Sequence, residues 1–240
     1  MLALVAEGAA VGIAGRDEHA LAKTAGAVDG LGGRALAVVG DVRSDTDVAD
    51  SVSRVEAHFG GIDLVVHCAG VFRSGSVTDL TEDDWDVVIA TNLKSCYLVG
   101  RHTVPALKRR GGGSIVNISS IAAFAGDAGG AAYSASKAGV NALTRIMALD
   151  HIGDRIRVNA VAPGNVRTPM LTSYAEEHYP DDPESMLAAA GDRHPIRRLI
   201  EPREVVDVAL FLLSDAASAV TGATYPVDGG WLGQLSEAGT

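Results

Sequence analysis

The chain has 240 residues, of which 47% are apolar and 21% are charged. This composition is typical of a globular protein with a full hydrophobic core, and we expect residues 1–240 to form a single α/β domain. The formal net charge of −10 argues against nucleic acid and anionic membranes as partners, because like charges repel.

No apolar run reaches the ~18 residues that a membrane-spanning helix needs, and the N-terminus has no secretory signal. The two cysteines, Cys68 and Cys96, each lie in an apolar stretch without metal-ligand spacing. We therefore expect a cytoplasmic protein with two buried, reduced thiols and no metal site.

Short apolar runs alternate along the chain with longer helical patterns. The predicted strands are 10–14, 35–39, 64–67, 114–119, 156–162 and 224–227. The predicted helices are 18–31, 45–59, a long helix within 85–107, 133–152 and 204–213. This alternation predicts a Rossmann-like, doubly wound parallel sheet, with ligands beyond the carboxyl ends of its strands.

Tyr133 and Lys137 stand four residues apart, so they share one face of a predicted helix. A nearby ammonium favours the phenolate, and we expect Lys137 to lower the pKa of Tyr133 towards the neutral range. The pair then forms a general acid/base for a carbonyl or an alcohol. On its own this spacing is common on helix surfaces.

Two further polar residues strengthen this interpretation. Ser120 follows a predicted strand, where its hydroxyl can donate to a substrate oxygen. Asn92 lies within the preceding helix, where asparagine is unfavourable because its side chain competes for backbone hydrogen bonds. A helix kink would explain Asn92 structurally, but its place before Ser120, Tyr133 and Lys137 favours a functional role.

The motifs together resemble the short-chain dehydrogenase/reductase family, and most of all its ketoacyl-carrier-protein reductase-like branch. The resemblance covers nearly the whole chain, and its motifs are Gly-Ser-Ile-Val-Asn-Ile-Ser-Ser, Tyr-Ser-Ala-Ser-Lys, Arg-Val-Asn-Ala-Val-Ala-Pro-Gly and Val-Thr-Gly-Ala-Thr-Tyr-Pro-Val-Asp-Gly-Gly, at residues 113–120, 133–137, 157–164 and 220–230. It implies an oxidoreductase that interconverts a small-molecule carbonyl and an alcohol by hydride transfer with NADP(H) or NAD(H).

The resemblance also implies a role for each matching residue. Tyr133 is the expected acid/base, Lys137 tunes it and holds the nicotinamide ribose, Ser120 binds the substrate oxygen, and Asn92 holds a relay water. Further cofactor contacts are expected from Asp41, Val42, Ala69, Gly70, Pro163, Gly164, Val166 and Thr168.

The segment after the first predicted strand bears on the choice of nicotinamide cofactor. The family usually places an acid at the position of Gly15 in NAD enzymes, where it accepts from the ribose hydroxyl. Here Arg16 follows instead, and an arginine suits a 2′-phosphate. We therefore favour NADP(H) over NAD(H), although a solvated arginine at a helix entry is the alternative.

The family's first strand and its glycine-rich phosphate loop have no counterpart in the sequence. Met1–Glu7 resembles the end of the first helix, and Gly8, Gly12 and Gly15 do not follow a strand and open a helix. Without a central strand the chain must close the gap, leave its first two strands displaced, or bury the edges against a partner. We expect a start codon assigned too late rather than a real loss, because the four chemical residues are all present.

Residues 171–200 correspond to the family's substrate lid, although their polar composition is also typical of a mobile, solvated loop. The long helices around 85–107 and 133–152 resemble those of the family's interfaces, so we expect a homodimer or homotetramer. The alternative to an enzyme is an oligomeric scaffold of the same fold that has lost cofactor binding.

Overall fold

The computed structural model describes residues 1–234, whose six strands form two parallel sheets. The strands are β1 (Val11–Gly15), β2 (Ala35–Val39), β3 (Leu64–His67), β4 (Gly113–Ile118), β5 (Ile156–Pro163) and β6 (Thr224–Val227). The larger sheet has the order β3-β4-β5-β6, and β1 and β2 pair only with each other. The first two strands are therefore displaced from the larger sheet, which is one of the outcomes expected from the lack of a central strand.

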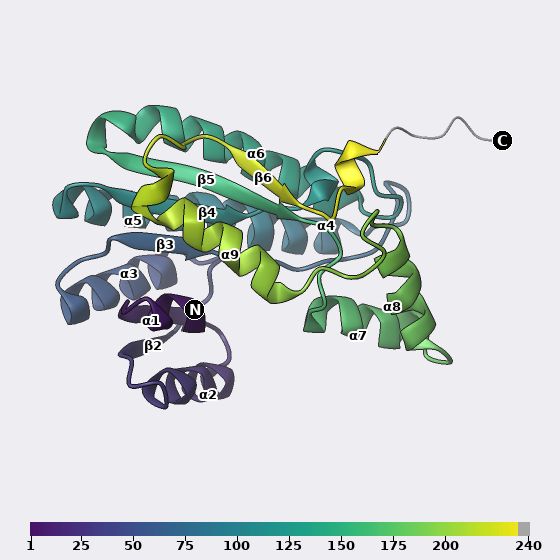
Figure 1. Ribbon diagram of the computed structural model, residues 1–240, viewed down its shortest axis with the longest axis horizontal. Helices are drawn as coiled ribbons and strands as arrows, with labels where there is room; N and C mark the ends of the chain where they lie inside the picture. Colours follow the sequence, from purple (N-terminus) through teal and green to yellow (C-terminus); the bar gives the residue numbers. More distant parts are fainter. Residues whose placement is uncertain (235–240) are drawn as a thin grey trace.

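Helices connect the strands, as the alternating pattern predicts. They are α1 (Leu2–Ala6), α2 (Glu18–Asp29), α3 (Asp45–Phe59), α4 (Glu82–Ile89), α5 (Ser95–Arg110), α6 (Ala131–His151), α7 (Pro169–His178), α8 (Pro183–Asp192) and α9 (Pro202–Leu213). Figure 1 shows β2 and α2 to one side of the larger sheet, beyond β3. None of the helices in residues 1–234 is long and apolar enough to cross a membrane.

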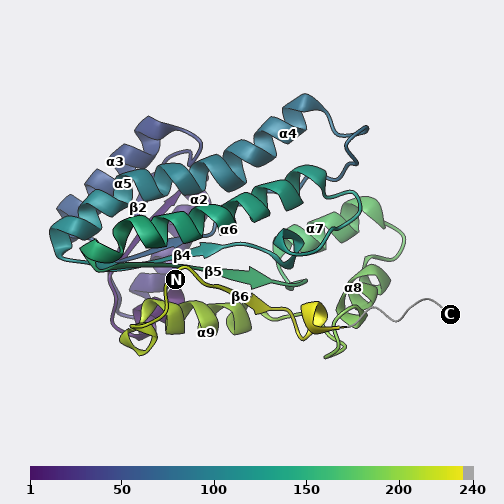
Figure 2. The same cartoon turned by 90° about the horizontal axis from the view of Figure 1, so that it is seen from above.

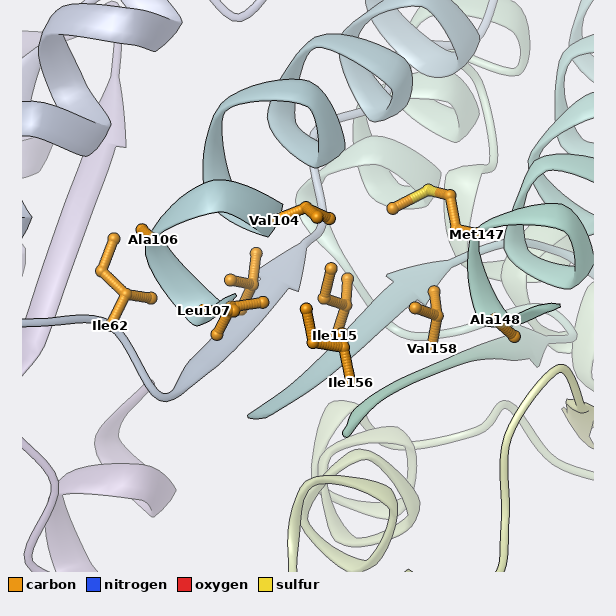
Figure 3. Packing of buried hydrophobic residues seen from close by; sticks show 10 residues of the cluster. Ile62, Val104, Ala106, Leu107, Ile115, Met147, Ala148, Ile156 and Val158 are labelled. Carbon is orange, nitrogen blue, oxygen red and sulfur yellow. The ribbon is translucent and has the colours of Figure 1, made fainter. Parts of the chain in front are cut away.

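The larger sheet is covered on both faces, with α5 and α6 on one face and α9 on the other (Figure 2). On the first face, Leu107 of α5 and Met147 of α6 pack against Ile115 and Val158 of the strands (Figure 3). On the second face, Leu212 of α9 packs against the same two central strands. Burial on both sides explains why these strands carry apolar side chains on both faces, and their buried Asn117 and Asn159 donate to the Thr144 hydroxyl and the Val220 carbonyl.

The edge of the larger sheet that β3 forms is only partly covered. Val65 and His67 are buried, whereas Leu64 and Val66 on the opposite face are each 39% exposed. Leu4 of α1 packs both against the cluster under α9 and against the small cluster beside β1. Helix α1 thus contacts both sheets without filling the place of a strand between them.

Residues 171–200 are mostly helical and not the solvated loop that their charge allows. Helices α7 and α8 share a small apolar core of their own, built from Ala175, Leu187, Ala190 and Leu199. Each helix begins with a proline, and the Asp182 carboxylate caps α8 by accepting from the Ser185 amide. These two helices lie beyond the carboxyl ends of β4 and β5, where the candidate site lies (Figure 2).

Candidate functional site

Helix α6 carries Tyr133 and Lys137 on one face near its N-terminal end, as their spacing predicts. The Tyr133 side chain is partly buried, and Lys137 is only 4% exposed. The Lys137 ammonium nitrogen lies over the Tyr133 ring, 5.6 Å from the ring centre. The two side chains are therefore neighbours inside the protein rather than a solvated pair on a helix surface.

The Lys137 ammonium has one hydrogen bond to the protein, which it donates to the carbonyl oxygen of Ile118 over 2.8 Å. Burial disfavours its charged form and lowers the pKa of Lys137 to about 8, although the nearby thiols of Cys96 and Cys68 act in the opposite direction. The carbonyl of Ile118, the last residue of β4, thus anchors the lysine at the end of the sheet.

The pKa of Tyr133 contradicts one expectation from the sequence. Burial raises it above the usual value, a hydrogen bond with Ser120 lowers it, and the Asp127 carboxylate raises it further. Lys137 was expected to lower this pKa, but its ammonium lies over the ring and is held by the Ile118 carbonyl. The Tyr133 phenol is therefore held protonated at neutral pH in this arrangement.

Ser120 lies two residues beyond β4 and caps the short 3-10 turn η2 (Ile121–Ala123). Its hydroxyl oxygen accepts a hydrogen bond from the Ala122 amide over 3.2 Å. This bond leaves the hydroxyl hydrogen available, and Ser120 also interacts with the Tyr133 phenol. Two hydroxyl groups that can both donate to one substrate oxygen therefore lie together at the end of β4.

Asn92 lies in a π-helical turn, η1 (Ala90–Lys94), between α4 and α5. Its buried side chain exchanges two hydrogen bonds with the backbone of Val71, accepting over 2.8 Å and donating over 3.0 Å. It also donates to the Ser136 hydroxyl over 3.0 Å. Asn92 therefore ties the loop after β3 to α6, and π-helical turns of this kind occur often at functional sites.

The loop after β3 brings Asn92 and Lys137 together. A methyl group added at Gly70 would lie 3.5 Å from the Lys137 ammonium and 3.6 Å from the Asn92 side-chain oxygen. Ala69 is partly buried beside it. Cys96 is buried as expected, but Cys68 is exposed, because β3 ends at His67 and the thiol lies beyond the sheet.

The segment after β5 follows the same edge of the sheet. Pro163 ends β5, and the Gly164 amide donates to the carbonyl of Val227 over 3.0 Å. Val166 forms a parallel bridge with Ile200, and Thr168 precedes α7 with its hydroxyl on the Val166 carbonyl. The segment is thus fixed by backbone bonds between β6 and the end of the lid.

The predicted adenosine contacts lie at the ends of β1 and β2. Asp41 binds the Arg43 guanidinium through both carboxylate oxygens, with a shortest distance of 2.6 Å. This pairing holds the pKa of Asp41 below its usual value, and Arg16 adds a smaller electrostatic effect in the same direction. Arg16 is exposed and Val42 is partly buried. The electrostatic effect of Arg16 on Asp41 indicates that these two side chains lie near one another.

Sequence reasoning missed Arg43, and it also missed an aromatic group beside Tyr133. The Phe72 ring packs edge-on against Tyr133 at 5.3 Å and against Tyr174 of α7 at 5.7 Å. Tyr174 stacks in turn on His178 at 4.1 Å. Phe72 thus connects the lid to the phenol ring of Tyr133. In the sequence, the only indication of this contact is the spacing of Tyr174 and His178, which places them on one helix face.

The residues fit one half of a nicotinamide nucleotide better than the other. Lys137 supplies a buried donor, and Gly70 keeps the loop after β3 free of a side chain where that loop approaches the ammonium. In residues 1–234, Gly8 joins a helix to a strand, and no glycine-rich loop leads from a strand into a helix to bind the pyrophosphate. The residues around Lys137 are compatible with the nicotinamide half of the nucleotide, and the described residues show no counterpart of the pyrophosphate loop.

Comparison with known proteins identifies the class to which this fold and this site belong. Residues 2–232 match the family described as Enoyl-(Acyl carrier protein) reductase. The oxidoreductase UcpA of Escherichia coli strain K12 is 41% identical over 87% of this chain and 80% of its own length. The chain therefore belongs to the short-chain dehydrogenase/reductase family and is an NAD(P)-dependent oxidoreductase.

Two further relatives have more specific names. The meso-2,3-butanediol dehydrogenase of Serratia marcescens is 37% identical over 94% of this chain and 85% of its own length. A solved structure of actinorhodin polyketide ketoreductase with NADPH is 35% identical, covers 94% of this chain and 88% of its own, and has a TM-score of 0.89. Both are related in fold and sequence, and they act on different compounds.

Proposed function

We propose that this chain interconverts a carbonyl and a secondary alcohol, with Tyr133 as the acid/base. The observation that carries the proposal is the buried group in which the Tyr133 phenol meets the Ser120 hydroxyl while the Lys137 ammonium lies over its ring. The names of related dehydrogenases and reductases support the same reaction class.

In reduction, the bound nicotinamide supplies the hydride that reaches the carbonyl carbon. The Ser120 hydroxyl donates to the carbonyl oxygen and orients it, and Tyr133 transfers its phenolic proton to that oxygen as the alcohol forms. Because burial raises the pKa of Tyr133, the phenol carries the needed proton at neutral pH. The resting phenol is therefore in the protonation state that the reductive step requires.

Lys137 and Asn92 have supporting roles around Tyr133. The buried Lys137 ammonium is held by the Ile118 carbonyl and lies over the Tyr133 ring, so it packs against the phenol that transfers the proton. Asn92 holds the loop of Gly70 and Val71 against α6, and this loop contacts the lysine. We expect Lys137 to bind the nicotinamide ribose as well.

We favour NADP(H) as the cofactor, because Arg16 follows β1 as an exposed cation beside the Asp41–Arg43 pair. Arg43 is already bound by Asp41, which leaves Arg16 to bind a 2′-phosphate. The matching contacts for the rest of the nucleotide are Asp41, Val42, Ala69, Gly70, Tyr133, Lys137, Pro163, Gly164, Val166 and Thr168.

Fluorescence titration of the purified chain with NADPH and NADH tests this proposal. We expect tighter binding of NADPH, and we expect R16A to weaken NADPH binding by about tenfold without affecting NADH. The matched variant R43A removes a cation that Asp41 already neutralises, so it should change NADPH binding less. A folded protein that binds neither nucleotide would contradict the enzyme and support the alternative of an oligomeric scaffold.

We further propose a homodimer or homotetramer built on α5 and α6. Large apolar side chains are exposed on these two helices and at the end of α6: Tyr97, Ile146, Leu149 and Ile152. Contiguous exposed apolar residues of this kind favour protein–protein contacts. Light scattering measures the mass, and L149E, at the most exposed of these positions, should shift it towards the monomer.

A further inference from the structure

His194 is fully buried at the point where the lid meets the proposed nicotinamide segment. It follows α8, and its ring reaches the segment after β5 and the turn after β6. The Trp231 ring packs edge-on against it at 5.2 Å. Three parts of the chain that are far apart in sequence therefore meet at one imidazole.

The two ring nitrogens of His194 have different partners. Nδ1 lies 2.9 Å from the carbonyl oxygen of Arg198, and Nε2 lies 3.1 Å from the backbone nitrogen of Asn165. A carbonyl oxygen only accepts, so Nδ1 must carry the hydrogen, and a backbone amide only donates, so Nε2 must be bare. Both bonds are satisfied by one neutral tautomer of the imidazole.

The neighbouring backbone packs closely against the His194 side chain. A methyl group at Gly164 would lie 2.5 Å from Nε2 of His194, which is too close for any real contact. At Gly229, whose φ is +58°, a methyl group would approach the His194 side chain to 3.3 Å and Ile196 to 2.5 Å. The His194 ring therefore excludes a side chain at Gly164, whereas Ile196 and the positive φ exclude one at Gly229.

Further bonds join the same two segments on either side of the ring. The Asn165 side chain donates to the Ala190 carbonyl at the end of the lid, over 3.0 Å. The Asn165 carbonyl accepts from the Ile200 amide over 2.9 Å, and the Arg167 amide donates to the Ile200 carbonyl over 2.9 Å. Within residues 163–168, the backbone amide of Asn165 is the group that donates a hydrogen bond to the His194 ring.

We propose that His194 is a positioning residue, which fixes the nicotinamide-binding segment 163–168 to the lid by accepting the Asn165 amide hydrogen at Nε2. The proposal rests on the proposed function for its effect on catalysis, whereas the contact itself does not depend on a cofactor. His194 touches neither substrate nor reacting atoms, and it acts through the backbone of Asn165.

Two substitutions test the hydrogen bonds at Nε2 and Nδ1 separately. In H194Q the side-chain amide reaches the place of Nε2 and still accepts from Asn165. In H194N the shorter amide reaches the place of Nδ1 and still donates to Arg198, but it leaves the Asn165 amide without its acceptor. H19N, at an exposed histidine of α2, is the matched control for the same change of residue type.

The first measurement is NMR of the wild-type chain without nucleotide. We expect nitrogen-15 correlations of the His194 ring to show the Nδ1–H tautomer and the Asn165 amide to exchange slowly with solvent. We expect Asn165 to stay protected in H194Q and H19N and to exchange at least about tenfold faster in H194N. An Nε2–H tautomer in the wild type, or equal exchange in H194Q and H194N, overturns the proposal even where one variant folds poorly.

The second measurement is nucleotide binding and steady-state kinetics. We expect H194N to raise the Kd and the KM for NADPH by about tenfold and H194Q by less than about threefold, with a smaller change in kcat than in KM. A change in kcat alone, equal in both variants, overturns the positioning role. A wild-type chain that binds no nucleotide but shows the expected exchange pattern refutes the proposed function and leaves the His194 contact established.

Discussion

The Lys137 ammonium donates to the Ile118 carbonyl over 2.8 Å and lies 5.6 Å from the centre of the Tyr133 ring. One side chain thereby links the end of the sheet to the proposed acid/base. Its burial has a measurable consequence, because an ammonium removed from water loses its proton more easily.

Lys137 should make the free energy of unfolding depend on pH in the alkaline range. Its pKa is lowered from 10.5 to about 8 in the folded state, mainly by burial. Between these values the unfolded chain binds a proton that the folded chain does not, so the penalty for folding disappears as the pH rises. Relative to K137M, the free energy of unfolding of the wild type should rise by about 2 kcal/mol from about pH 7.5 to about pH 9.5.

Urea unfolding of both proteins across this pH range measures the difference. Burial raises the pKa of Cys96 to about 12, which makes alkaline pH unfavourable for folding. Burial of Cys96 is the larger cause and is present in both proteins, whereas the opposing effect of the Lys137 charge is lost in K137M, so the comparison is made below about pH 9.5, where the Cys96 contribution is small. A difference that stays constant or falls with pH would show that the lysine is solvated in solution.

Replacement of Asn92 should lower the free energy of unfolding more than replacement of Ser136, whose hydroxyl accepts a hydrogen bond from it. N92A leaves the amide and carbonyl of Val71 and the Ser136 hydroxyl without their partner, and it should cost about 2–4 kcal/mol of unfolding free energy. S136A keeps both bonds between Asn92 and Val71 and should cost about 1 kcal/mol. Denaturant titrations of the two variants compare these costs, and similar values would refute the anchoring role of Asn92.

The aromatic contact between the lid and Tyr133 predicts an effect on the substrate and not on the cofactor. Y174A removes the ring that packs against Phe72, and it should lower kcat/KM for a carbonyl substrate by about tenfold. The Kd for NADPH should not change. Y179A, at a half-exposed tyrosine just beyond α7, is the control, and equal effects of both variants would argue against the contact.

Much of the fold follows from the local sequence pattern. The bounds of β2, β3, β6 and α3 are those that apolar runs and helical periodicity predict. Strand β5 is one residue longer than predicted, and β1 and β4 are each shifted by one residue at both ends. The patterns are clear because each strand is a short apolar run between polar or glycine-containing turns. The separation of β1 and β2 from the larger sheet is one of the outcomes that the lack of a central strand predicts.

The lid was harder to predict because its charged residues obscure a small core. Pro169, Asp182 and Pro183 are helix-start signals, but they are weak without knowledge of Leu187 packing against Leu199. The number and spacing of charges in this segment suggested solvation instead.

In the candidate site, the sequence predicts which residues lie together, but it does not predict their pKa values. The spacing of Tyr133 and Lys137 placed them on one helix face, but the raised pKa of Tyr133 depends on burial by neighbours from other elements. The π-helical turn around Asn92 and the buried position of His194 also depend on tertiary packing. No periodicity of the sequence encodes either feature.

The most direct test of the proposed chemistry is single-turnover hydride transfer from NADPH to a panel of carbonyl compounds, comparing the wild type with Y133F. The substitution removes only the phenolic hydroxyl, so fold and NADPH binding should be retained. We predict that the rate of NADPH oxidation falls by at least about a thousandfold. A wild-type rate in Y133F, with the same carbonyl and the same bound NADPH, would contradict the assignment of Tyr133 as the acid/base.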